Sequence, residues 1–377
     1  MKKQVKNFVL TFLCPAVTLV ILVLLCLNPA GCRSTVEGVD LIDGDYSVPK
    51  IKSFCVASAN CVTIDFSRNV TVSDVYVFKK NDDESVSRIC SAEYENDSKT
   101  AMLRFADSTV TGETYVAEGT VRDEKGNTLT FSIPFLGYND NMARVILSEV
   151  RNCYGLASVN KVKVHKGEYV ELYVLEDGNL SGIEISSASD GSKTKYVIPP
   201  CDVKKGDFVT VHMRKGNTKK VVEDGMISEL DSNLLLSTHV DSSSSRDLWS
   251  ENLDAVFPDN DVVYVRNSQD SSIIDAVIFG KSSLKSWNSA CERYLQKIWD
   301  AGIWQGGFDA GNIVCADYVT ATAASRSYSR INVEQIQADY DKGLYLSGEP
   351  FPNSRDTWIV TNKVTPGGAN SKSVYTK

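Results

Sequence analysis

Apolar and polar positions alternate along most of the chain, and this pattern predicts strands. Between residues 48 and 139 the alternation comes in short runs separated by turn residues, for example in Val62, Thr63, Ile64, Asp65 and Phe66. A period of two favours half-buried strands. Two such runs, 115–121 and 129–135, flank the turn at 123–127 and predict a hairpin. About seven strands in roughly ninety residues are typical of a β-sandwich, which we expect over residues 48–140.

The same alternation continues after a polar break at residues 137–141, which we interpret as a domain boundary. Strands are predicted near residues 145–150, 168–173, 179–185, 208–213, 261–265, 274–280, 325–330 and 356–360. They indicate a second domain over residues 141–371 with two insertions, 215–258 and 282–304. The first contains Ser242–Ser245 and is predicted to be a surface excursion. The second predicts an amphipathic helix within 282–300 whose apolar side packs on the sandwich, with Trp299 and Trp304 extending it. The residues at helical spacing are Leu284, Trp287, Cys291, Tyr294, Leu295 and Ile298.

The first 32 residues follow a different pattern. Lys2, Lys3 and Lys6 precede an almost wholly apolar run at residues 8–27, and Ala30 and Gly31 lead into Cys32. This order resembles the signal sequence of a bacterial lipoprotein. The resemblance implies that residues 1–31 are removed, that Cys32 is lipidated, and that residues 32–47 form a tether on the extracytoplasmic side. An uncleaved anchor helix and a secreted protein cleaved after Ala30 are the alternatives.

Two further resemblances concern the domains. Residues 48–140 resemble bacterial immunoglobulin-like modules of surface and S-layer proteins, through their strand pattern and the closing stretch from Gly119 through Phe135. The strand blocks after Ala143, and above all residues 353–360 and 365–370, resemble the lamin-tail domain, an immunoglobulin-like sandwich that bacteria also carry on exported proteins. Together they imply an all-β chain of two consecutive immunoglobulin-like β-sandwiches, the second lamin-tail-like with a helical insertion. In this arrangement Trp358 lies in the core on a closing strand that pairs with strands about two hundred residues earlier, and residues 365–367 turn the chain away.

Net charge excludes one class of partner. Removal of residues 1–31 takes away three lysines and no acidic residue, which moves the formal charge from −8 to −11. Such a surface repels phosphates, so we expect no binding of nucleic acid.

Seven cysteines follow Cys32, an odd number without paired Cys-x-x-Cys spacing. Cys55 and Cys61 flank a short turn and are the candidate disulfide. For the remaining cysteines, buried thiols are an equally good interpretation.

Candidate chemistry is sparse. The chain has three histidines, and alternation predicts an exposed position for His212. No hydrolase, nucleotide-binding or metalloprotease motif occurs, so we predict no catalytic residues, no metal and no cofactor. The acidic groups at residues 82–84, at Asp254 and at residues 259–261 are interpreted as surface charge rather than calcium ligands. Glu171 is predicted to hydrogen-bond a neighbouring loop.

These features predict a non-enzymatic, lipid-anchored protein of the cell envelope, periplasmic or surface-exposed, that acts as a binding or scaffolding module. Its expected partners are the membrane, through the lipid on Cys32, and an unidentified protein or envelope polysaccharide. A component of an extracytoplasmic hydrolase or nuclease system, accessory or catalytic, is the alternative. An envelope-structural role without a specific ligand is a third interpretation.

Overall fold

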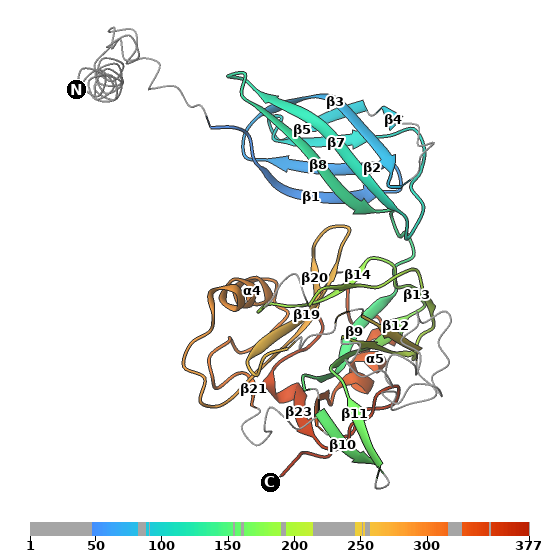
Figure 1. The fold of residues 1–377 in the computed structure, drawn as a ribbon, viewed down its shortest axis with the longest axis vertical. Helices are drawn as coiled ribbons and strands as arrows, with labels where there is room; N and C mark the ends of the chain where they lie inside the picture. Colours follow the sequence, from blue (N-terminus) through green and yellow to red (C-terminus); the bar gives the residue numbers. More distant parts are fainter. Residues whose placement is uncertain are drawn as a thin grey trace, which may run out of the picture.

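The computed structural model describes residues 47–81, 88–89, 91–153, 155–159, 162–189, 194–213, 246–250, 252, 257–315, 326–346 and 348–376. It shows two β-rich domains, one after the other along the chain (Figure 1). The all-β prediction with two consecutive sandwiches is therefore confirmed. The predicted signal segment, Cys32, the tether up to residue 46, Asp82–Glu84, residues 215–245 and Asp254 lie outside the described residues.

The N-terminal domain consists of two four-stranded antiparallel sheets. One has the order β1-β2-β6-β5 and the other β4-β3-β7-β8. The strands are β1 (Ile51–Ser58), β2 (Cys61–Phe66), β3 (Val70–Lys79), β4 (Arg88–Ile89), β5 (Ser91–Glu95), β6 (Thr100–Arg104), β7 (Thr114–Asp123) and β8 (Thr128–Leu136). Val62, Ile64 and Phe66 are almost fully buried in one core, as expected when alternate side chains of a strand point to the same face.

The C-terminal domain is larger and has a second, separate core. A six-stranded sheet has the order β18-β17-β12-β9-β22-β23, and a five-stranded sheet the order β15-β14-β19-β20-β21. Their strands are β9 (Arg144–Arg151), β12 (Tyr169–Glu176), β14 (Ile183–Ser187), β15 (Tyr196–Val197), β17 (Phe208–His212), β18 (Arg246–Trp249), β19 (Asp261–Asn267), β20 (Ile273–Gly280), β21 (Val314–Cys315), β22 (Ser327–Arg330) and β23 (Trp358–Thr361). Two short pairs complete the domain, β10 (Gly155–Val159) with β11 (Val162–Lys166), and β13 (Gly178–Asn179) with β16 (Asp202–Val203).

In the part of the chain that the structure describes, two helices accompany these sheets. α4 (Ser289–Asp300) lies beside β19 and β20 (Figure 1) and buries Cys291, Leu295 and Ile298. It begins later than the predicted segment because Asn288 caps it, accepting a hydrogen bond from the Cys291 amide at 2.8 Å. Trp304 is buried as predicted, but Trp299 is 51% exposed. The other helix is α5 (Val333–Asp341), and a short 3-10 turn, η4 (Arg355–Thr357), precedes β23.

The prediction of a surface excursion over residues 215–258 is wrong for its later part. Residues 246–249 return as edge strand β18 and pair in parallel with β17. Leu248 and Trp249 are buried there. A four-residue strand inside a polar, serine-rich stretch gives too short a periodic signal to be recognised.

The closing strand is partly as predicted. Trp358 is buried in the core, which is confirmed, and its indole N–H donates to Asn353 Oδ1 at 2.8 Å. However, β23 pairs with β22, about thirty residues earlier, rather than with a strand two hundred residues away. The long-range closure is made by β22, which pairs with β9. Behind Trp358, Arg330 forms a buried ion pair with Asp275.

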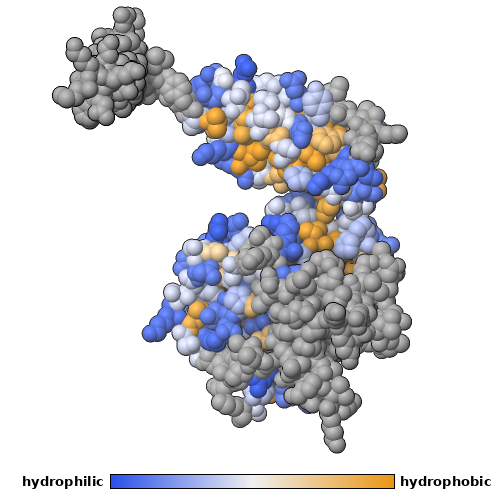
Figure 2. All heavy atoms as spheres, viewed as in Figure 1, coloured by the Kyte–Doolittle hydropathy of each residue, from blue (hydrophilic) through white to orange (hydrophobic). Residues whose placement is uncertain are grey.

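The domains meet at the turn between β19 and β20. Gln269 accepts a hydrogen bond from the Val56 amide of strand β1 at 2.6 Å through its backbone carbonyl, and its side-chain oxygen accepts one from the Asn139 amide. Asn139 is itself 4% exposed, so the polar break at 137–141 is anchored rather than fully solvated. Figure 2 shows the domains joined on one side, beside an open notch. Within the described residues, no helix has both the length and the apolar composition to cross a bilayer.

Candidate binding pocket

The segment after β23, residues 362–376, lies over the outer face of the six-stranded sheet; we call it the C-terminal segment. The Thr365 amide donates to Glu149 Oε2 at 3.1 Å, and the Gly367 amide donates to Glu171. The Asn370 side-chain amide donates to the carbonyl of Ser148 at 2.9 Å. The prediction that residues 365–367 turn the chain away is therefore wrong, because these residues hold it against β9 and β12.

Two buried carboxyl groups anchor the C-terminal segment. Glu149 and Glu171 face each other across β9 and β12, and both are fully buried. Glu149 also accepts from Tyr169 Oη at 2.7 Å and from Ser327 Oγ at 2.5 Å. The loop hydrogen bond predicted for Glu171 is confirmed, with Gly367 as the donor.

Burial sets the protonation of these two groups. Desolvation raises the pKa of Glu149 above its ordinary value, although hydrogen bonds from Ser327, Tyr169 and Thr365 oppose it. Desolvation, together with repulsion by Glu149, raises the pKa of Glu171 well above its ordinary value. The pair therefore retains protons to a higher pH than exposed glutamates do.

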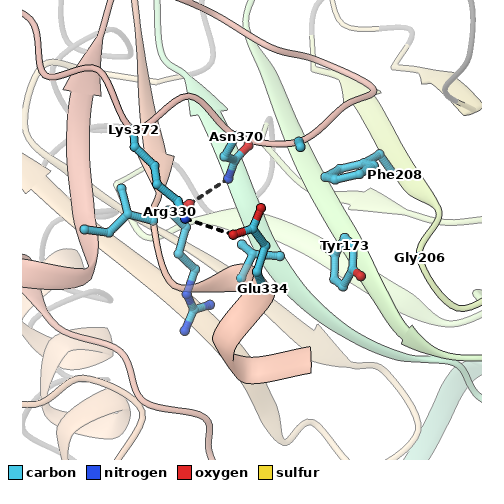
Figure 3. A pocket seen from close by; sticks show the side chains of 10 residues that line it. Tyr173, Gly206, Phe208, Arg330, Glu334, Asn370 and Lys372 are labelled. Atoms are coloured by element: carbon cyan, nitrogen blue, oxygen red, sulfur yellow. Dashed lines mark hydrogen bonds and ion pairs between the residues drawn. The ribbon is translucent and has the colours of Figure 1, made fainter. Parts of the chain in front are cut away.

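Next to this pair, the C-terminal segment forms one wall of a cavity of about 190 Å³ (Figure 3). The opposite wall is aromatic, since Tyr173 of β12 and Phe208 of β17 meet edge to face with ring centroids 5.1 Å apart. The remaining lining comes from Gly206, from residues around the start of α5 and from the C-terminal segment, namely Arg330, Ile331, Val333, Glu334, Ala369, Asn370 and Lys372. An engineered apolar cavity of about 150 Å³ holds benzene, so this pocket has room for one ring-sized group.

The polar groups of the pocket divide into two sets. Inside the pocket, the Asn370 side-chain amide donates to the carbonyls of Ser148 and Arg330. Both of its N–H groups are therefore used within the protein. Glu334 and Lys372, by contrast, form an ion pair of 2.8 Å with side chains that are 71% and 63% exposed. The pocket thus combines a mostly apolar interior with a solvent-exposed ion pair at its mouth.

His212 does not occupy the exposed position predicted for it. It is buried at 2% exposure, contacts Asp247 Oδ1 at 2.5 Å and stacks on Trp249 with centroids 3.7 Å apart. Alternation predicts that His212 is exposed only if no other residue covers its face of β17. Asp247 and Trp249 of β18 cover it. The pair fastens the edge strand β18 to β17.

The interpretation of residues 259–261 as surface charge is wrong for Asp261. This residue is fully buried and accepts hydrogen bonds from Ser189 Oγ at 2.7 Å and from the Val262 amide at 2.8 Å. Burial raises its pKa to about 6. Asp259 remains near the surface and pairs with Lys281. No group of three or more His, Cys, Asp or Glu side chains suited to a metal ion occurs in the part of the chain that the structure describes.

The candidate disulfide is not formed in the structure. Cys55 stands opposite Thr63, and Cys61 stands opposite Ser58, so the two cysteines lie diagonally on neighbouring strands with free thiols. Burial raises the pKa of both thiols.

The pocket itself was not predicted. Tyr173 and Phe208 lie on predicted strands, but their contact depends on the pairing of β12 with β17. The sequence feature that could have indicated the pocket is the presence of Tyr173 and Phe208 on strand faces that alternation predicts to be exposed. Glu334 and Lys372, 38 residues apart in the chain, meet only in the folded structure.

The fold and the pocket define an all-β protein of two consecutive sandwiches, with a ring-sized pocket beneath its C-terminal segment. Residues 143–367, more than half of the chain, match the family model TP_1001_2nd, described as a protein second domain. The chain belongs to this family. A protein of Treponema pallidum (strain Nichols), named only as uncharacterized, is 28% identical over 193 residues, which are 51% of this chain and 46% of that relative. The chain thus spans less than half of the relative's length.

Solved structures show weaker likenesses. A DUF4876 family protein from Bacteroides thetaiotaomicron is similar over 81% of this chain and 92% of its own, at 12% identity and a TM-score of 0.30. The N-terminal part of the bacterial S-layer protein SbsC is similar over 64% of this chain and 46% of its own, at 12% identity and a TM-score of 0.25. At these TM-scores neither likeness bears on the function of the chain.

Proposed function

We propose that the protein is an exported, lipid-anchored component of the cell envelope whose C-terminal domain binds a ligand in the pocket under the C-terminal segment. The observation that carries the binding role is this pocket, which combines an aromatic wall with an exposed ion pair at its mouth. Ligand sites are typically concave and mostly apolar, with a few polar groups that fix orientation.

The location rests on the N-terminal sequence. A positive start, a long apolar run and small residues before Cys32 support export and acylation. The likeness of residues 143–370 to a lamin-tail domain, and of residues 48–140 to a bacterial immunoglobulin-like module, remains part of the proposal. Both suit a protein that presents a binding surface outside the cytoplasm.

The anchor is tested by metabolic labelling with palmitate. Wild-type protein should incorporate the label and partition with membranes, while Cys32→Ala should lose the label and accumulate as precursor or in the soluble fraction. Two or more acyl chains give stable membrane residence, so the difference should be complete. Unchanged labelling of Cys32→Ala would contradict the lipoprotein proposal.

The binding role is tested by a photo-crosslinking amino acid placed at Phe208 in intact cells. Intact-mass spectrometry should reveal one dominant adduct, whether it is a small molecule or a protein. The matched control is the same group at Tyr76, which is 38% exposed on the N-terminal domain. Equal, heterogeneous adducts at both positions would contradict a specific pocket.

A further inference from the structure

We propose that the pocket binds a zwitterionic amino acid with an apolar, ring-sized side chain. This inference rests on the proposed function, because it names the ligand class of the same site. It follows from an apolar interior of defined size that lies directly beside one carboxylate and one ammonium group.

The interior matches the apolar part of such a ligand. Tyr173 and Phe208 form the aromatic wall, and Val333, which is 6% exposed, contributes an aliphatic surface. A cavity of about 190 Å³ accommodates a phenyl or isobutyl group, since about 150 Å³ suffices for benzene. Edge-to-face contact with the two rings adds attraction for an aromatic side chain.

The mouth matches the charged part. The Glu334 carboxylate projects between Lys372 and the aromatic pair in Figure 3, and the two charges are 2.8 Å apart. Exposed ion pairs contribute little stability, so separating this pair costs little. A ligand whose ammonium binds Glu334 and whose carboxylate binds Lys372 replaces one ion pair with two.

A neutral sugar ring fits the same cavity less well. Sugar hydroxyls need several polar partners inside the site, but the Asn370 amide is bound to backbone carbonyls, and Arg330 is bound to Asp275 and to the carbonyl of Pro352. A side chain of a partner polypeptide would fill the cavity without supplying the two charges. The test below separates a polypeptide side chain from a free amino acid.

The experiment is isothermal titration calorimetry on the chain from residue 33 onward, with L-phenylalanine and L-leucine as probes. Both should bind, and glycine should bind at least about tenfold more weakly because it leaves the apolar cavity empty. N-acetyl-L-phenylalanine amide, which lacks both charges, should also bind at least about tenfold more weakly. Equal affinity for the capped compound would overturn recognition of a zwitterion and favour a polypeptide side chain.

Variants locate the binding site. Glu334→Gln and Lys372→Gln should each weaken L-phenylalanine binding several-fold or more, while unchanged melting curves show that the fold is intact. The matched control is Arg104→Gln, which removes an exposed ion pair with Glu93 in the N-terminal domain and should leave binding unchanged. Binding unaffected by both pocket variants would overturn the assignment. Absence of binding by either amino acid, with a specific adduct at Phe208 in cells, would overturn the ligand class but leave the proposed function intact.

Discussion

Two buried glutamates, Glu149 and Glu171, hold the C-terminal segment against the six-stranded sheet. Glu149 and Glu171 would be costly to bury alone, and they are accommodated because backbone amides and hydroxyl groups donate to them. Alternation correctly placed both residues on strands. It could not show that their face is covered, because the cover comes from residues about two hundred positions later.

Because the pKa of Glu171 is raised, we expect this residue to make the stability of the fold depend on pH. A carboxyl group whose pKa is raised on folding stabilises the fold fully below its ordinary value, 4.5, and this contribution is lost as pH rises through the raised value. Glu171→Gln removes the titration while retaining an acceptor for the Gly367 amide. Its free energy of unfolding, measured by urea denaturation, should therefore fall less between pH 4.5 and 8 than that of the wild type.

Asp177→Asn is the control, because hydrogen bonds from Lys205 and Lys204 lower the pKa of this exposed group. Asp177→Asn should leave the pH dependence of the free energy of unfolding above pH 4.5 unchanged. Parallel curves for Glu171→Gln and the wild type would show that Glu171 does not titrate differently on folding.

Trp358 provides a stability prediction. Trp358→Ala leaves a cavity in the core and removes the indole N–H that donates to Asn353 Oδ1, so it should cost about 3–5 kcal/mol. Trp287→Ala is the matched comparison, because Trp287 is only partly buried and donates a hydrogen bond to the nearby Phe308 carbonyl, so its loss should cost less. Denaturant unfolding of the chain from residue 33 measures both variants. Equal losses would mean that Trp358 has no special place in the core.

At the scale of elements, the strongly periodic strands and the amphipathic helix were predictable, whereas β18 and the C-terminal segment were not. β18 has only four residues, and its burial depends on His212 and Trp249. The C-terminal segment has no periodicity, and its hydrogen bonds to Glu149 and Glu171 come from backbone amides, which every residue except proline supplies. Sequence patterns depend on side chains, so they do not predict hydrogen bonds made by backbone amides.

Deletion of residues 362–377 tests the role of the C-terminal segment. It leaves β23 in place but removes the Thr365 and Gly367 amides, which donate to Glu149 and Glu171, and one wall of the pocket. Differential scanning calorimetry should show a lower melting temperature for the C-terminal domain and an unchanged transition for the N-terminal domain. An unchanged melting temperature for both domains would make the segment dispensable.

At the scale of the whole molecule, the two cores are separate, but the residues between them are structured. The Asn139 side-chain amide donates to the carbonyls of Asn179 and Ser181, both at 2.9 Å. Asn139 thus belongs to the C-terminal domain although it lies within the polar break. The polar composition of residues 137–141 locates the domain boundary approximately. The buried hydrogen bonds of Asn139 assign this residue to the C-terminal domain.

This placement predicts a difference between two fragments. Residues 139–377 and 141–377 should both fold cooperatively. The shorter fragment lacks the Asn139 amide, which donates to the Ser181 carbonyl and is one of two donors to the Asn179 carbonyl, so it should be less stable by about 1–3 kcal/mol. Urea denaturation of the two fragments measures the difference. Equal stabilities would mean that Asn139 contributes nothing to the C-terminal domain.

The central claim is that the C-terminal segment closes the domain over the carboxyl pair and completes the pocket. Hydrogen exchange of the Thr365 and Gly367 amides, resolved by NMR, tests it most directly, because these amides donate to Glu149 and Glu171. We expect both amides to be protected nearly as strongly as amides in the centres of β9 and β12. Exchange of both amides at the rate of an unstructured peptide would contradict it.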